Sequence, residues 1–185
     1  TLGKGVTNEV DSPPQKIDVK SVDYNLKKMV VSWNRYDEPD FSSYELQYAR
    51  EEAGPRALFA AITDADQNRF EMTDFDPTHR NWFWVQVTDR WGQTSVGKGM
   101  SNEVDSPPRK LDIRSVNYSL DEMVAKWRRS KDKDFKNYEI LYSETKDGER
   151  VSLETISKRK KTSYTVTDFD PSHENWFWIN VAEKW

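Results

Sequence analysis

The sequence predicts an all-β chain of two tandem seven-stranded antiparallel β-sandwiches, the second lacking its last strand within the 185 residues. One observation behind this prediction is an internal repeat without insertions. The other is a two-residue alternation of apolar side chains in short segments, which is typical of half-buried strands. No segment shows a long 3.6-residue period, so we expect no helices.

The repeat is evident in several motifs that share one spacing. TNEVDSPP at residues 7–14 returns as SNEVDSPP at residues 101–108, an offset of 94 residues (101 − 7). The same offset maps NWFW at residues 81–84 onto residues 175–178. So many matches at one offset indicate two copies of one structural unit.

The ends of the chain fall inside the repeating pattern. LGKGV at residues 2–6 matches VGKGM at residues 96–100, which closes the first copy. We therefore divide the chain into residues 1–10, the last strand of a preceding repeat, residues 11–104, the first copy, and residues 105–185, a second copy without its last strand. We therefore expect the chain to be a window on a longer array of such repeats.

The expected strands alternate with turn-rich stretches. In the first copy they are centred on residues 17–22, 29–33, 44–48, 70–72 and 83–87, with counterparts 94 residues later. The stretches at residues 36–40, 51–55 and 64–68 carry the Asp, Gly, Pro and Asn residues that favour turns. Only 35% of residues are apolar, but 13% are aromatic, and large rings can build a core from few residues.

Several motifs of one copy occur together in a known family. They are a Pro-Pro pair before the first strand, Trp33 at the end of the second, the Tyr44–Tyr48 pattern Tyr-x-Leu-x-Tyr, the Phe75–Pro77 corner and the Val85–Asp89 strand end. With their counterparts they resemble the fibronectin type III family over nearly the whole chain. The resemblance implies immunoglobulin-like sandwiches, and the DRWGQ segment after Thr88 is similar to bacterial secreted or surface versions.

One position departs from that family. Where the family usually has a corner tyrosine, this sequence has Asn81 or Trp82. We therefore expect the corner hydrogen bond to be absent or to be made differently.

Composition excludes several classes of function. The net charge is −4 without a basic stripe, and the Lys158–Lys161 run is expected to be a solvated loop, so we expect no nucleic-acid partner. No cysteine is present, which excludes disulfides and zinc–thiolate sites. No apolar run approaches the roughly 20 residues of a membrane helix, so no membrane span is expected in this window.

Catalytic chemistry is not indicated either. The only histidines, His79 and His173, occupy the same turn of the two copies, and no nucleophile motif accompanies them. We predict no catalytic residues and no enzyme.

Six acidic residues are candidates for a calcium site. The corner loop, the exit toward the next copy and a loop of that copy would supply about six hard oxygens, as calcium requires. The residues are Asp74, Asp76, Glu103, Asp105, Asp132 and Asp134. The alternative, which we favour, is that these acids cap turns, so no cofactor is expected.

Tryptophans on the sheet are the candidate binding residues. If Phe83 points inward, Trp82 and Trp84 lie on the opposite face of the strand, as do Trp176 and Trp178 in the second copy. We favour their packing against long Arg and Lys side chains. The alternative is a surface that stacks on glycans or binds a protein.

The incomplete second copy suggests self-association. Its open sheet edge could take up residues 1–10 of another molecule by strand addition, and repetition would build a filament. The alternative is a fragment boundary within a continuous array. We expect a non-enzymatic extracellular or cell-surface rod, stalk or filament of bacterial origin, with neighbouring repeats or copies of itself as partners. The other classes are a glycan- or protein-binding adhesion module and an accessory domain of a polysaccharide-degrading enzyme.

Overall fold

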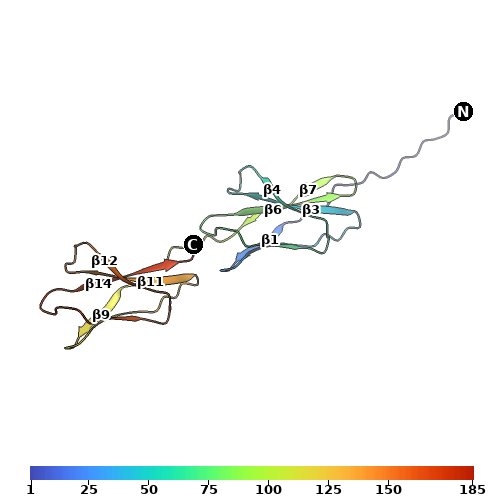
Figure 1. The fold of residues 1–185 in the computed structure, drawn as a ribbon. Coiled ribbons are helices and arrows are strands. Elements are labelled where there is room, and N and C mark those ends of the chain that lie inside the picture. Colours follow the sequence, from blue (N-terminus) through green and yellow to red (C-terminus); the bar gives the residue numbers. More distant parts are fainter. The chain divides into compact units, whose positions relative to one another are not determined.

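The computed structural model describes residues 1–185 and contains strands but no helix. No helix is therefore long and apolar enough to cross a membrane. The chain divides into two compact units, which we call the first unit (Thr1–Asp105) and the second unit (Ser106–Trp185). Figure 1 shows each unit as two facing layers of strands.

The first unit is a sandwich of two antiparallel sheets. Its strands are β1 (Val19–Tyr24), β2 (Met29–Trp33), β3 (Phe41–Ala49), β4 (Ala57–Ile62), β5 (Arg69–Met72), β6 (Trp82–Asp89), β7 (Thr94–Val96) and β8 (Met100–Ser101). One sheet has the order β1-β2-β5, and the other has the order β4-β3-β6-β7, with β8 also paired to β6. Because β7 and β8 both pair with β6, they act as two halves of one last strand.

The second unit repeats this arrangement as far as its sixth strand. Its strands are β9 (Ile113–Tyr118), β10 (Met123–Trp127), β11 (Phe135–Ser143), β12 (Val151–Ile156), β13 (Ser163–Val166) and β14 (Trp176–Glu183). The sheets have the orders β13-β10-β9 and β12-β11-β14. Strand β14 is therefore a sheet edge in this chain, whereas the equivalent β6 is paired on both sides.

Aromatic side chains fill the space between the sheets of each unit, as the composition suggested. In the first unit Trp33 lies edge-on to Tyr44 with ring centroids 5.8 Å apart, and in the second unit Trp127 and Tyr138 are 5.7 Å apart. The buried Tyr44 hydroxyl donates to the carbonyl oxygen of Ala65 (3.1 Å), so its polar end is satisfied. Burial of each such large side chain stabilises the fold by about 1.5–3 kcal/mol.

The two cores differ on the side of the missing strand. Val22 in β1 is 7% exposed, whereas the equivalent Val116 in β9 is 38% exposed. In the first unit the backbone N–H of Val19 donates to the carbonyl oxygen of Lys98 (3.0 Å), so the last strand lies against β1. The second unit has no such segment within this chain.

Candidate functional site

The corner before β6 is held by an asparagine in place of a tyrosine. The Asn81 side-chain amide donates to the carbonyl oxygens of Asp76 (2.9 Å) and His79 (3.1 Å). Asn175 makes the same two bonds in the second unit. The corner hydrogen bond is thus made differently, by a shorter side chain that spans the same turn.

A second asparagine attaches the last strand of the first unit to this corner. Asn102 follows β8 and is 3% exposed. Its Oδ1 accepts from the backbone N–H of Asn81 (2.7 Å), and its Nδ2 donates to the carbonyl oxygens of Glu103 (2.8 Å) and His79 (3.1 Å). The residue satisfies backbone groups of both the corner and the strand end.

The segment between β7 and β8 joins the two sheets of the first unit. The backbone N–H of Gly97 donates to the carbonyl oxygen of Val85 in β6 (3.2 Å). On the other side, Val19 of β1 donates to Lys98, whose own N–H donates to the Asp18 carboxylate (2.6 Å). The last strand therefore closes the sandwich along one side.

Two glycines permit this close approach. A Cβ on Gly97 would collide with the backbone carbonyl of Ile17, and a Cβ on Gly99 would collide with the indole of Trp84. Residues with side chains cannot occupy either position without displacing a neighbour, so the Gly-Lys-Gly sequence is a steric requirement of the closing strand.

The second unit presents the same side as an open groove. The groove has a volume of about 420 Å³ and is lined by residues 113–116 of β9 and residues 174–177 at the start of β14. Under the 94-residue offset, these residues correspond to those that flank Gly97–Ser101 in the first unit. The groove is thus the place that a closing strand occupies in the complete copy.

A segment with the sequence of a closing strand is present at the N-terminus. Leu2–Asn8 reads LGKGVTN where the first unit's closing strand reads VGKGMSN. Residues 1–10 are exposed and form no strand. Neither Gly3 nor Gly5 has an atom within 4 Å of a Cβ position, so both glycines are sterically free in this segment.

The tryptophan pairs lie opposite the core, on the face that the alternation predicted. Trp82 and Trp84 stack with centroids 5.9 Å apart, and Trp176 and Trp178 stack at 6.2 Å. The guanidinium groups of Arg56 and Arg150 lie over Trp84 and Trp178, at 4.1 and 4.3 Å from the ring centroids. Packing against arginine, the arrangement that we favoured, is therefore present in both units.

One of the four rings is not at the surface. Trp84 is only 3% exposed, because Arg56 covers one side and the Gly99 backbone runs close to the indole. Trp84 therefore lies on the expected face of the sheet but is buried there, since alternation predicts the face and not what covers it. Trp82, Trp176 and Trp178 keep partial exposure, and their role in binding stays a prediction.

Among the acids proposed for calcium, Asp76 caps a turn. Its Oδ1 accepts from the Thr78 N–H (2.9 Å) and hydroxyl (2.6 Å), and its Oδ2 lies 3.1 Å from His79 Nδ1. The Thr78 bonds, with a smaller contribution from His79, lower the pKa of Asp76. Asp170 makes the equivalent contacts with Ser172 and His173, so this histidine turn is a local structural feature of both units.

The other proposed calcium ligands differ in their exposure and in their hydrogen-bond partners. Asp74 and Glu103 are exposed. Asp105 accepts from the Tyr24 hydroxyl (3.1 Å), and Asp132 accepts from the Ser130 hydroxyl (3.0 Å). Asp134 is buried, and its Oδ2 has no hydrogen-bond partner.

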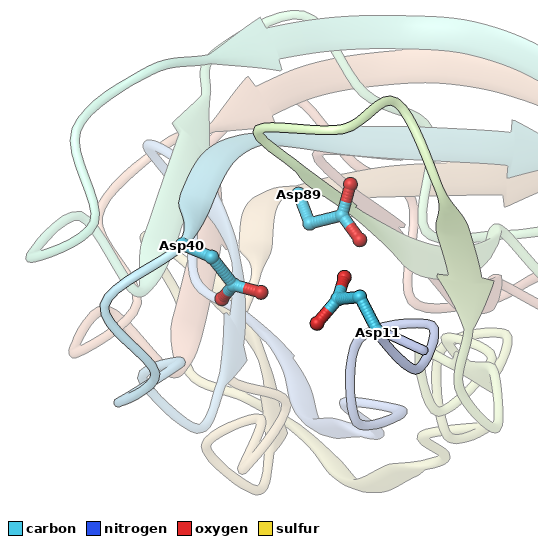
Figure 2. A group of neighbouring side chains, drawn as sticks. All are labelled: Asp11, Asp40 and Asp89. Atoms are coloured by element: carbon cyan, nitrogen blue, oxygen red, sulfur yellow. The ribbon is translucent and has the colours of Figure 1, made fainter. Parts of the chain in front are cut away.

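A different group of carboxylates comes together in the first unit. Asp11, Asp40 and Asp89 place one oxygen each within 4.8 Å of one another (Figure 2). The sequence hypothesis did not include this group, although its second-copy candidates Asp105 and Asp134 are the 94-residue counterparts of Asp11 and Asp40. Applying the repeat offset to those candidates would have found two of the three.

The two facing antiparallel sheets make each unit an immunoglobulin-like β-sandwich. The family model "Fibronectin type III domain" matches residues 106–184. A crystal structure of the chicken CNTN1 FN1-FN3 domains is similar over 92% of this chain and 60% of that chain, with 16% identity and a TM-score of 0.40. This chain therefore spans less than two thirds of the length of that one. No curated protein matches the sequence.

Proposed function

We propose that this chain is a non-enzymatic architectural segment whose tandem modules form an extracellular rod, stalk or filament. The observation that carries the proposal is the match between the open groove of the second unit and the exposed Leu2–Asn8 segment. The first unit contains the same pair of partners in contact, because Gly97–Ser101 lies between β1 and β6. Modules that close one another with a shared strand type are suited to linear assembly.

The interiors of the units also favour an architectural role. The space between the sheets is occupied by packed rings such as Trp33 and Tyr44. The histidines, which would be the usual general bases, lie in exposed turns against the capping carboxylates of Asp76 and Asp170. These features support a scaffold rather than a catalyst, and the resemblance of the DRWGQ segment supports a bacterial secreted or surface location.

Two sources could supply the closing strand of the second unit. One is residues 1–10 of a second copy, which gives a head-to-tail filament. The other is chain beyond residue 185, which closes the unit within one polypeptide. We propose the first for molecules that consist of residues 1–185, because the segment and the groove are both accessible in this chain.

Sedimentation velocity of the 185-residue chain over a range of concentrations tests strand addition. We expect concentration-dependent assembly that is lost in Gly5→Val, because Gly99, the counterpart of Gly5, cannot carry a Cβ against Trp84. The matched control is Lys4→Val, since the counterpart Lys98 is exposed. Neither substitution disturbs the first unit, because both residues lie in the exposed segment.

A chain that stays monomeric at the highest concentration would overturn filament formation. Equal assembly by Gly5→Val and the parent chain would show association through another surface. Loss of assembly on deletion of residues 1–10, with retention in Lys4→Val, would support the proposal.

The alternative function is adhesion through glycans or a surface protein. It rests on the partly exposed ring of Trp82, which stacks on Trp84, and on its counterpart Trp176. Binding to a glycan array that is lost in Trp82→Ala and Trp176→Ala would favour it. Binding that survives both substitutions would exclude these rings as the contact.

A further inference from the structure

Three carboxylates from separate parts of the first unit converge at one end of its sandwich. Asp11 precedes the Pro13-Pro14 pair, Asp40 precedes β3, and Asp89 ends β6. One oxygen from each residue lies within 4.8 Å of the other two. Figure 2 shows the side chains of all three directed toward a common space.

Asp89 has an unsatisfied oxygen at this place. The residue is 1% exposed, and its Oδ1 accepts from the backbone N–H groups of Trp91 (2.9 Å) and Gln93 (2.8 Å). Its Oδ2 is buried without a hydrogen-bond partner. A buried carboxylate oxygen without a donor is unfavourable, because the hydration that it lost on folding is not replaced. The turn accounts for one oxygen of Asp89 and leaves the other available to a ligand.

The protein supplies neutral donors to this cluster. Asp11 Oδ2 accepts from the Gln93 amide (2.8 Å), and Asp40 Oδ1 accepts from the Tyr36 hydroxyl (3.3 Å). The cations that form ion pairs in the first unit pair with other acids: Lys28 with Glu71, Arg35 with Asp37 and Asp66, and His79 with Asp76.

The surroundings of Tyr36 reflect the concentration of negative charge. Its hydroxyl donates to both Glu38 (3.0 Å) and Asp40 (3.3 Å). The Glu38 carboxylate therefore adds a further negative charge beside Asp40.

The donor set selects the kind of cation. All three ligands are carboxylate oxygens, which hard cations prefer, and no sulfur or imidazole contributes. Two oxygens on opposite sides of a calcium ion, each bonded at about 2.4 Å, lie about 4.8 Å apart. Magnesium requires a tighter octahedron and keeps more of its water.

We propose that Asp11, Asp40 and Asp89 bind one Ca²⁺ ion, with water completing its coordination. The ion would tie the segment before Pro13-Pro14 to the ends of β3 and β6, and thereby fix how the chain enters the first unit. The 94-residue offset places an acid at each equivalent position of the second copy, Asp105, Asp134 and Glu183. The site goes beyond the proposed strand addition and does not depend on it.

Isothermal titration calorimetry of the metal-depleted 185-residue chain with CaCl₂ tests the site. We expect Asp89→Asn to bind one Ca²⁺ fewer per chain than the parent. Asn keeps the acceptor for Trp91 and Gln93 but removes the charge, so the turn is preserved. The matched control, Asp23→Asn, changes an exposed aspartate of β1 and should lose no ion.

Thermal unfolding gives a second readout. Without calcium, Asp89→Asn should melt about 2–5 °C above the parent, because it removes repulsion among three acids. With saturating calcium the order should reverse, and magnesium at the same concentration should not produce the reversal. An Asp40→Asn variant covers the case in which Asp89→Asn does not fold.

Two results would overturn the proposal. One is the absence of calcium binding by the parent chain. The other is an unchanged number of bound ions in both Asp89→Asn and Asp40→Asn. Either outcome would leave the strand-addition proposal untouched, since that proposal concerns residues 1–10 and the second unit.

Discussion

At the scale of single residues, Asn81 and Asn102 determine how the first unit is closed. Asn81 turns the chain into β6 by bonding two backbone carbonyls, and Asn102 accepts from the Asn81 N–H. The sequence identified Asn81 as the departure from the corner tyrosine, and short amides that bond nearby backbone groups are typical of such turns. The role of Asn102 was not predicted, because its partners in the corner, Asn81 and His79, lie more than 20 residues away in the chain.

We predict that Asn102→Ala destabilises the first unit by about 2–3 kcal/mol. The substitution leaves the Asn81 N–H and the carbonyl oxygens of His79 and Glu103 without their buried partner, and unsatisfied buried groups are costly. The measurement is amide hydrogen exchange of β3 and β6 under native conditions. Asn8→Ala is the matched control. Asn8 is the counterpart of Asn102 at the 94-residue offset, but its side chain is exposed. Equal protection factors in both variants would contradict the prediction.

At the scale of strands, hydrophobic alternation located most of the sandwich. Strands such as β2 and β3 alternate buried and partly exposed residues, which is the pattern that the sequence displayed. Strands β4 and β12 were missed. They are sheet edges in which only the last residue is buried. The sequence ALFAAI has no polar residue to alternate with, and in VSLETI the alternating Val151 and Leu153 are exposed whereas Ile156 is buried.

The candidate sites show the same limit more strongly. Alternation predicted which face of β6 carries Trp84, but its burial depends on Gly99 in another strand. Likewise, Asp11, Asp40 and Asp89 converge only because the fold brings a linker, a loop and a strand end together. Local sequence patterns predict the strand or turn in which a residue lies. These sites instead depend on contacts between elements that are distant in the chain.

At the scale of the whole molecule, two copies that align at one offset without insertions form units that differ in completeness. The first unit buries Val19 and Val22 beneath its closing strand, and the second leaves the equivalent Ile113 and Val116 partly exposed. Less apolar burial and an unpaired β14 edge should lower the stability of the second unit. The stability of this chain is therefore a property of each unit and not a single value.

We predict that the chain unfolds in two steps in urea and that the second unit unfolds first. NMR signals of Trp127 in the core of the second unit and of Trp33 in the core of the first unit show which unit unfolds in each step. A synthetic peptide of residues 1–10, added to a dilute chain, should raise only the midpoint of the first step. At a peptide concentration of 100 times the Kd, the second unit should be stabilised by about 2.7 kcal/mol, because the peptide binds the folded unit and not the unfolded chain.

A peptide with valine in place of Gly3 and Gly5 is the control and should have no effect. These glycines correspond to Gly97 and Gly99 of the first unit, where a Cβ has no room. Stabilisation by both peptides would show non-specific pairing with the β14 edge, and stabilisation by neither would show that the groove does not accept this strand.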